Sequence, residues 1–242
     1  MKKESSETEH LTDFYSKLLV TNEVFNIIQE GNLRILNEQS KIMKQEELSA
    51  DVEYLLNFVN NHKDLVLEII KEMDNYAFKN LPSLNEKNFI SFGGDSSRYF
   101  ILQDEIKLYP HTLNVAIQMA DMLSESEHPN NIIEIGILLA LFHDFGKCPQ
   151  IALNYCEEKN ESHEKISANF AKHFLTAYNK RNPKGAINDD VIQTVYQTIY
   201  NHHNPVIIQK GVFLTMLIKA DRNARDFELR MVKMRRAQDA KI

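Results

Sequence analysis

The segment from Ile132 to Phe145 constrains the fold of this chain more than any other part of its sequence. It is apolar on nearly every side of a helix, with Glu134 as an interruption. A helix of this composition is surrounded by other elements of a core, and Gly146, which follows it, is a common residue at a helix end. The segment falls well short of the roughly 20 residues that span a bilayer. We therefore expect a buried central helix and no membrane span.

Most of the remaining chain carries the pattern of amphipathic helices. Apolar residues recur at spacings of three and four in residues 11–19, 55–73, 113–123 and 191–202. Seven Gly and six Pro are few for 242 residues, which argues against a sandwich of short strands joined by tight turns. The sequence therefore predicts an all-α fold.

One stretch interrupts the helical pattern and suggests how the chain is divided. Phe-Gly-Gly-Asp-Ser-Ser, shortly before residue 98, has the composition of a loop. We expect an N-terminal helical region over residues 1–98 and a second helical domain over residues 99–242.

Charge and cysteine content exclude several classes of protein. The net charge of −6 argues against a generally basic nucleic-acid coat, and Cys148 and Cys156 are too few for a disulfide framework. The charged and polar start of the chain does not resemble a signal peptide. A reducing cytoplasm is the expected location. One basic run stands near the C-terminus, and it can either meet phosphates or form a solvated helix face: Arg222, Arg225, Arg230, Lys233, Arg235 and Arg236.

Histidines and aspartates lie where the predicted helices begin or end. The buried helix leads into His143 and Asp144, and His111 follows Pro110 in the first turn of another helix. Asp221 comes directly after the apolar helix 213–220 and points inward by its spacing. Four histidines show no comparable placement: His10, His62, His128 and His173.

Buried carboxylates and clustered imidazoles are costly unless something compensates them. A metal ion can serve several helices at once, and mixed His and Asp ligation without cysteine favours iron, manganese, zinc, magnesium or nickel over a structural zinc knot. Structural alternatives remain for each residue: an ordinary helix end for His143 and Asp144, a first-turn residue for His111, and for Asp221 an acid paired with Arg222 or Arg225.

With these residues the sequence resembles the HD superfamily of metal-dependent phosphohydrolases. The similarity covers roughly residues 99 to 225. It rests on His-Thr-Leu-Asn-Val-Ala from His111, Leu-Phe-His-Asp-Phe-Gly-Lys ending at Lys147, Ser-His-Glu around His163, Tyr-Asn-His-His-Asn-Pro with His202 and His203, and Ile-Lys-Ala-Asp-Arg with Asp221.

The resemblance implies a compact all-helical domain with one or two divalent ions. The first ion would be bound by His111, His143, Asp144 and Asp221. In two-metal members, Asp144 would bridge to a second ion held by residues that match His163, His202 and His203. The alternatives are that His163 is only a polar first-turn residue, and that one of the two adjacent histidines belongs to the core.

The resemblance also implies a reaction, the hydrolysis of a phosphoester by metal-activated water. Asp144 and Lys147 would be the catalytic residues, because the Lys147 ammonium can neutralise charge on phosphoryl oxygens. The alternative for Lys147 is a surface residue near a helix C-terminus. Lys147, Arg222 and Arg225 are the candidate substrate-binding residues.

The substrate class is less constrained than the reaction. The chain lacks the Glu-Asp that guanosine-alarmone hydrolases carry after the His-Asp pair and the Gly-Tyr-Pro signature of cyclic-di-GMP phosphodiesterases. A nucleotide or another small phosphorylated compound is expected. Two alternatives remain: a non-catalytic regulatory or interaction module, in which the N-terminal helices mediate homo-oligomer assembly, and a nuclease or relaxase-like protein that acts on nucleic acid through its basic C-terminal run.

Overall fold

The structure is a computed structural model that describes residues 50–84, 99, 101–102, 105–159, 161–204 and 211–239. Within these residues all regular elements are helices, with one isolated β-bridge between Pro82 and Lys107. The predicted all-α class is therefore confirmed. None of the described helices is both long enough and apolar enough to cross a membrane. The N-terminal helices proposed for homo-oligomer assembly lie largely outside the described residues.

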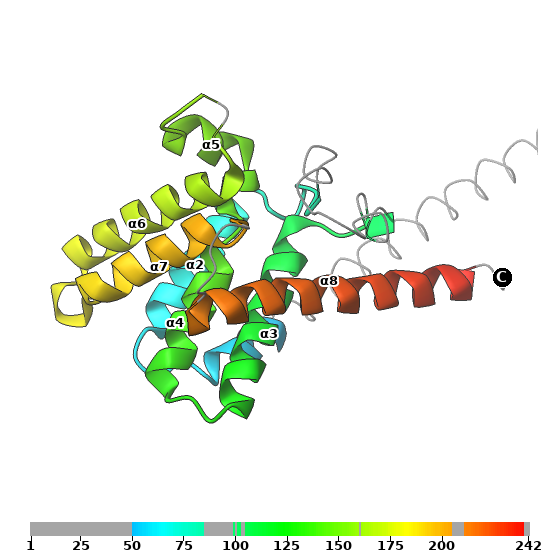
Figure 1. Cartoon of the computed structure of the whole chain (residues 1–242), viewed down its shortest axis with the longest axis horizontal. Coiled ribbons are helices and arrows are strands. Elements are labelled where there is room, and N and C mark those ends of the chain that lie inside the picture. Colours follow the sequence, from blue (N-terminus) through cyan, green and yellow to red (C-terminus); the bar gives the residue numbers. More distant parts are fainter. Residues whose placement is uncertain are drawn as a thin grey trace, which may run out of the picture. The chain divides into compact units, whose positions relative to one another are not determined.

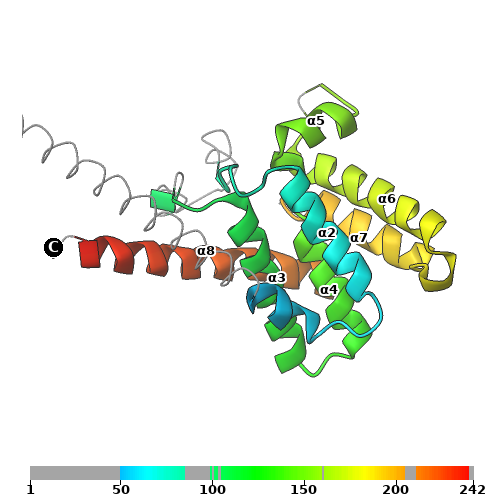
Figure 2. The same ribbon diagram turned by 180° about the vertical axis from the view of Figure 1, so that it is seen from behind.

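The chain divides after Ala50, and the unit that begins at Asp51 is described here. Its helices are α2 (Lys63–Asn75), α3 (Leu108–Glu125), α4 (Asn130–Phe142), α5 (Pro149–Tyr155), α6 (His163–Arg181), α7 (Asp189–Asn201) and α8 (Val212–Asp239). Helix α3 packs against α4 and α8, and α6 packs along α7 (Figure 1). From behind, α2 is seen beside α4 (Figure 2). Residues 51–84 thus share the core of the later helices. The expected boundary near residue 98 lies outside the described residues.

Helix α4 is the central element that its composition predicts. It contacts α2, α3, α6, α7 and α8, and Ile137, Leu139 and Leu141 have no exposed surface. It ends at Phe142, earlier than the apolar run suggests, and a short 3-10 helix, Phe145–Lys147, follows. The reason is a packing contact: beyond the helix end, the ring of Phe145 stacks on Phe170 of α6 with 4.6 Å between ring centroids.

Gly146 allows α6 to approach the end of α4. Its backbone N–H donates a hydrogen bond of 2.7 Å to Oγ of Ser167. A Cβ atom at this position would lie 2.1 Å from the carbonyl oxygen of His163 and 2.9 Å from the backbone nitrogen of Ser167. Both are backbone atoms in the first turns of α6, so they have little room to move. Because Gly146 has no side chain, the first turn of α6 can lie beside His143 and Asp144.

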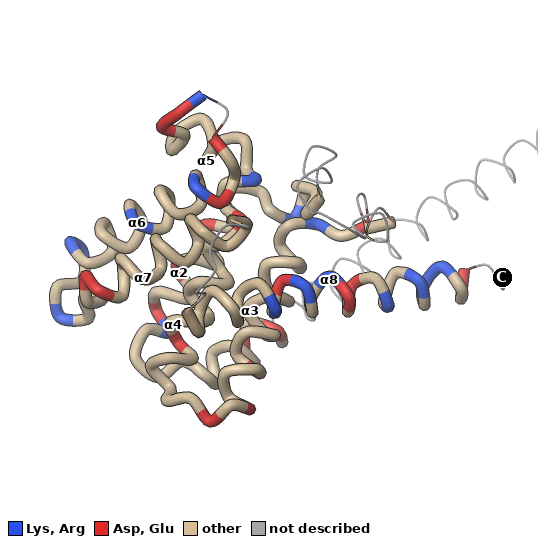
Figure 3. The backbone as a smooth tube through the Cα atoms, viewed as in Figure 1, with Lys and Arg blue, Asp and Glu red and all other residues tan. Residues whose placement is uncertain are grey.

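Helix α8 corrects the expectation that a helix ends just before Asp221. It continues to Asp239, because the sequence after Ala220 contains neither Gly nor Pro and keeps an apolar side. Ala224, Leu229 and Val232 are buried along that side. Acidic and basic residues are mixed in the first part of the helix, and basic residues prevail toward its C-terminal end (Figure 3). Asp221 therefore occupies a regular helical position.

Candidate metal centre

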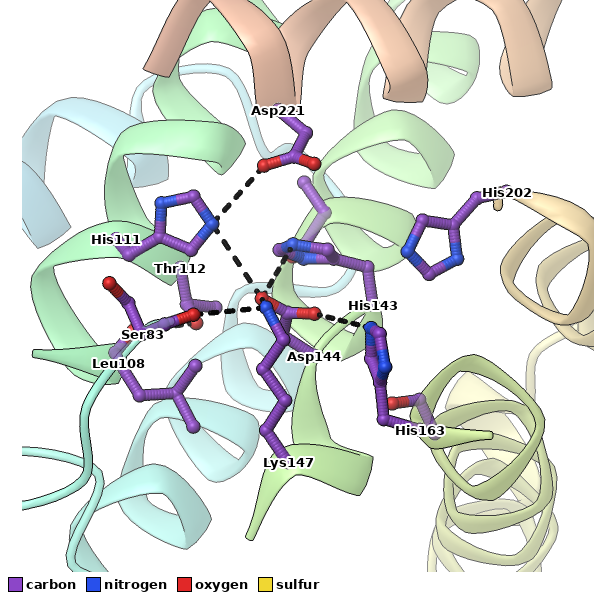
Figure 4. Close-up of polar contacts among 12 residues, drawn as sticks. Ser83, Leu108, His111, Thr112, His143, Asp144, Lys147, His163, His202 and Asp221 are labelled. Atoms are coloured by element: carbon purple, nitrogen blue, oxygen red, sulfur yellow. Dashed lines mark hydrogen bonds and ion pairs between the residues drawn. The ribbon is translucent and has the colours of Figure 1, made fainter. Parts of the chain in front are cut away.

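The structure brings the four residues of the first predicted ligand set together (Figure 4). His111 comes from the first turn of α3, His143 and Asp144 from the end of α4, and Asp221 from α8. Nε2 of His111 lies 3.2 Å from Oδ1 of Asp221 and 3.6 Å from Oδ2 of Asp144. Nε2 of His143 lies 3.2 Å from the same Oδ2. Residues from three separate helices therefore converge on one point.

The second predicted set lies next to the first. His163 is the first residue of α6, and His202 and His203 follow the last residue of α7. One ligand atom from each of these three histidines lies within 4.8 Å of the others. Nε2 of His163 is 3.5 Å from Oδ1 of Asp144. Asp144 thus directs one carboxylate oxygen toward each set, as a bridging ligand would.

Six buried polar atoms of these residues have no hydrogen-bond partner among the described residues. They are Nε2 of His111, His143, His163 and His202, and Oδ1 of Asp144 and Asp221. An unsatisfied buried polar atom costs about 1–3 kcal/mol, and such atoms are rare in native proteins. Their concentration in one place indicates a common partner that the protein atoms do not supply.

Hydrogen bonds on the opposite ring nitrogen fix three of these histidines. Nδ1 of His111 lies 2.9 Å from Oε1 of Glu228. Nδ1 of His143 lies 2.6 Å from the Ala140 carbonyl oxygen, and Nδ1 of His202 lies 2.7 Å from the Ile199 carbonyl oxygen. Carboxylate and carbonyl oxygens accept hydrogen bonds, so we assign the proton to Nδ1 in each ring. Each Nε2 then presents a lone pair to the centre, which is how a metal-ligating histidine is oriented.

The arrangement fits a divalent cation. The lone pair on Nε2 of His111 and a carboxylate oxygen of Asp221 face each other at 3.2 Å. Two acceptors at this distance repel unless a metal cation or an additional proton on Nε2 lies between them. Neutral imidazoles and carboxylates without a thiolate match the ligands that iron, manganese or zinc take in proteins. Cys148 is buried but directs its sulfur toward the Tyr76 carbonyl.

Lys147 is part of the centre. Its Nζ donates to Oδ2 of Asp144 at 2.6 Å and to the Ser83 carbonyl at 3.1 Å, and its side chain is 7 % exposed. This burial excludes the alternative of a surface lysine. Burial alone would raise the pKa of Asp144, but its interactions with His143 and with the Lys147 ammonium outweigh burial and hold that pKa well below its usual range. Asp144 is therefore ionised at neutral pH.

The second set of histidines is kept neutral. Burial, with Lys147 nearby, lowers the pKa of His163 well below its usual value. Burial and the proximity of His143 lower the pKa of His202, and burial together with His202 lowers the pKa of His203 to about 3. Their lone pairs are consequently available to a cation at neutral pH.

These shifts predict a pH dependence for the metal-free protein. The unfolded chain protonates these histidines near pH 6.5, whereas the folded chain does not, so stability should fall as the pH drops from 7 to 5. His203 alone should lower the free energy of unfolding by roughly 1 kcal/mol for each pH unit below 6.5. His143 acts in the opposite direction, because its interaction with Asp144 outweighs burial and raises its pKa. Urea unfolding in excess chelator measures the slope. His203→Gln should make the free energy of unfolding depend less on pH, and an unchanged dependence would contradict a neutral, buried His203.

The basic residues expected to bind substrate have different surroundings. Arg225 is buried, and its guanidinium donates to the hydroxyl and carbonyl of Ser83 and to Glu228. Arg222 is exposed. Further along α8, Arg235 and Arg236 pair with Glu105. The basic run is thus partly neutralised within the protein, which weakens the support for a nucleic-acid surface. Substrate binding by Arg222 and Arg225 stays a prediction.

Two residues around the centre were not identified from the sequence. Glu228 holds His111, and its spacing of seven from Asp221 on the same helix is a signal that could have found it. Ser83 links Lys147 to Arg225, and no sequence pattern marks it. His62, by contrast, lies away from the predicted ligands, with its Nδ1 2.9 Å from Oε2 of the buried Glu134.

Comparison with known proteins identifies the family. The model of the HD domain matches residues 108–241, more than half of the chain, and this match includes all of the predicted ligands. No curated protein and no solved structure matches the chain. The family match and the convergence of the His and Asp side chains agree with each other. The chain is a member of the HD domain family.

Proposed function

We propose that this protein is a divalent-metal-dependent phosphohydrolase that cleaves a phosphoester of a nucleotide or another small phosphorylated compound. HD domains bind divalent metals and are typically metal-dependent hydrolases. The observation that carries the proposal is the set of six unpartnered buried atoms, all on predicted ligands of the two adjoining sets.

Each side chain has a proposed role in this function. His111, His143, Asp144 and Asp221 would hold one ion, and His163, His202 and His203 would hold a second with Asp144 as the bridge. A bound divalent ion polarises a phosphoryl oxygen and lowers the pKa of water toward 7. The burial of these side chains excludes bulk water, which strengthens the electrostatic interactions among them. Lys147 stands beside Asp144 and would neutralise charge on the phosphoryl oxygens.

The substrate must approach from the exposed side of this cluster. Asp221 and His163 retain 16 % and 17 % of their side-chain surface, whereas His111 and Asp144 retain 0 % and 1 %. Asp221 and His163 therefore form the less buried edge of the centre. A phosphate group, which is small and negatively charged, suits an edge formed by metal ligands.

Turnover assays on a panel of phosphomonoesters and phosphodiesters, with manganese or ferrous iron, test the proposal. The wild type should hydrolyse at least one member. His202→Gln should reduce kcat by roughly 10²-fold or more, because it removes one buried ligand nitrogen from the centre. His173→Gln replaces an exposed histidine and should leave activity unchanged.

The same preparations distinguish the enzyme from a non-catalytic module. Elemental analysis of the wild type should find bound metal, and His202→Gln should contain less. A protein that binds metal but hydrolyses no member of the panel would favour a regulatory module. A protein with no affinity for any divalent ion would contradict the proposed function altogether.

A further inference from the structure

His111 is oriented differently from the other fixed histidines of the centre. Nδ1 of His143 and Nδ1 of His202 each donate to the carbonyl three residues earlier in the same chain segment. These bonds form wherever the local helix forms. His111 instead donates to Glu228, which lies on α8 and is 117 residues away in the sequence. The orientation of its ring thus depends on the packing of α8 against α3.

Glu228 is itself held in place. Its side chain is 1 % exposed. Asn114 donates to its Oε1 at 3.1 Å, and Arg225 donates to its Oε2 at 3.2 Å. Arg225 is anchored in turn by the hydroxyl of Ser83 at 2.8 Å and by its carbonyl at 3.0 Å. The carboxylate therefore has a fixed position and a fixed direction.

Helix α8 contacts both nitrogens of the same imidazole. Asp221 and Glu228 are seven residues apart and so lie on one face of the helix. Oδ1 of Asp221 is 3.2 Å from Nε2 of His111, and Oε1 of Glu228 is 2.9 Å from Nδ1. A helix that supplies one candidate ligand thus also orients another.

We propose that Glu228 is a positioning residue for the metal centre: it holds the His111 proton on Nδ1, aims Nε2 at the ion, and increases the basicity of that nitrogen. This inference rests on the proposed metal centre but goes beyond its ligands. A carboxylate behind a ligating histidine acts in this way in other metal sites, and its loss typically weakens metal binding by about 10- to 100-fold. A purely structural Glu228, which only pairs with Arg225, would have no such effect.

Metal affinity of Glu228→Gln tests the proposal, and the chain offers a matched control. Glu134 is also a buried carboxylate with Nδ1 of a histidine, His62, at 2.9 Å, but it lies outside the centre. Manganese binding is measured by calorimetry with chelator competition on full-length protein. We expect binding to Glu228→Gln to be about 10- to 100-fold weaker than to the wild type, and Glu134→Gln to match the wild type. Equal affinities of Glu228→Gln and the wild type would overturn the proposal.

A second measurement does not depend on a variant that must fold or on bound metal. Nitrogen-15 NMR of the imidazoles in the metal-free wild type reports which ring nitrogen carries the proton. The proposal requires that His111 carries it on Nδ1; a proton on Nε2 alone would overturn it. Because both readouts are independent of turnover, a wild type that binds metal without hydrolysing any phosphoester would refute the proposed reaction and leave this inference standing.

Discussion

Asp144→Asn is expected to abolish the proposed phosphohydrolase activity and to prevent metal binding at both predicted ligand sets. The substitution keeps the shape of the side chain but eliminates the charge that faces His111 and His143 through one oxygen and His163 through the other. We expect kcat to fall at least about 10³-fold, toward the upper end of the effect of losing one electrostatic contact. Turnover assays and elemental analysis measure the two effects together. Activity above a tenth of the wild-type value would contradict the central role of Asp144.

The same substitution should also destabilise the metal-free protein. Lys147, whose Nζ is 2.6 Å from the Asp144 carboxylate, would be left as a buried ammonium without its counter-charge. Removing one partner of a buried ion pair costs about 3–5 kcal/mol. The double variant Asp144→Asn with Lys147→Met should recover most of this stability, because both charges are then gone, while activity stays absent. Urea unfolding of the three proteins in excess chelator measures the difference; a double variant as unstable as the single one would contradict this pairing.

Gly146→Ala is expected to have the second large effect. The new Cβ would lie 2.1 Å from the His163 carbonyl oxygen, so the first turn of α6 must move away from the end of α4. The cost should be about 3 kcal/mol, at the upper end for overpacking, because a backbone atom blocks the space. His163 moves with its helix, and the metal content of the protein should therefore fall as well.

Gly185→Ala is the control for this substitution. A Cβ at residue 185 meets nothing within 4 Å, and the turn that contains it lies at the far end of α6. Unfolding free energy and metal content should both stay near the wild-type values. If Gly146→Ala also retained wild-type stability and metal content, the close approach of α6 would not be what places His163.

The helices and their ligands were predictable because both are local signals. Helical periodicity located α3, α4 and α7, and the family motifs placed candidate ligands at their ends. The exact ends were harder to predict. Helix α4 stops at Phe142 because Phe145 packs against α6, and α8 continues through Asp221 because its buried side continues. Both outcomes depend on tertiary contacts that a periodic pattern does not contain.

The residues that support the centre were the least predictable. Ser83 contacts Lys147 and Arg225 only because the segment before α3 folds over the end of α4 and against α8. Glu134 interrupts an apolar run, and its role appears only when His62 and the neighbouring backbone N–H groups reach it from another segment. Such contacts join residues far apart in sequence, so they follow from packing and not from spacing along the chain.

Anomalous diffraction from a crystal of the full-length protein grown with manganese would locate the ions. We expect a peak bounded by His111, His143, Asp144 and Asp221, and, for a two-ion centre, a second peak between Asp144 and His163, His202 and His203. A manganese-bound crystal with no peak among these side chains, or with its peaks elsewhere on the protein, would show that they do not form a metal centre.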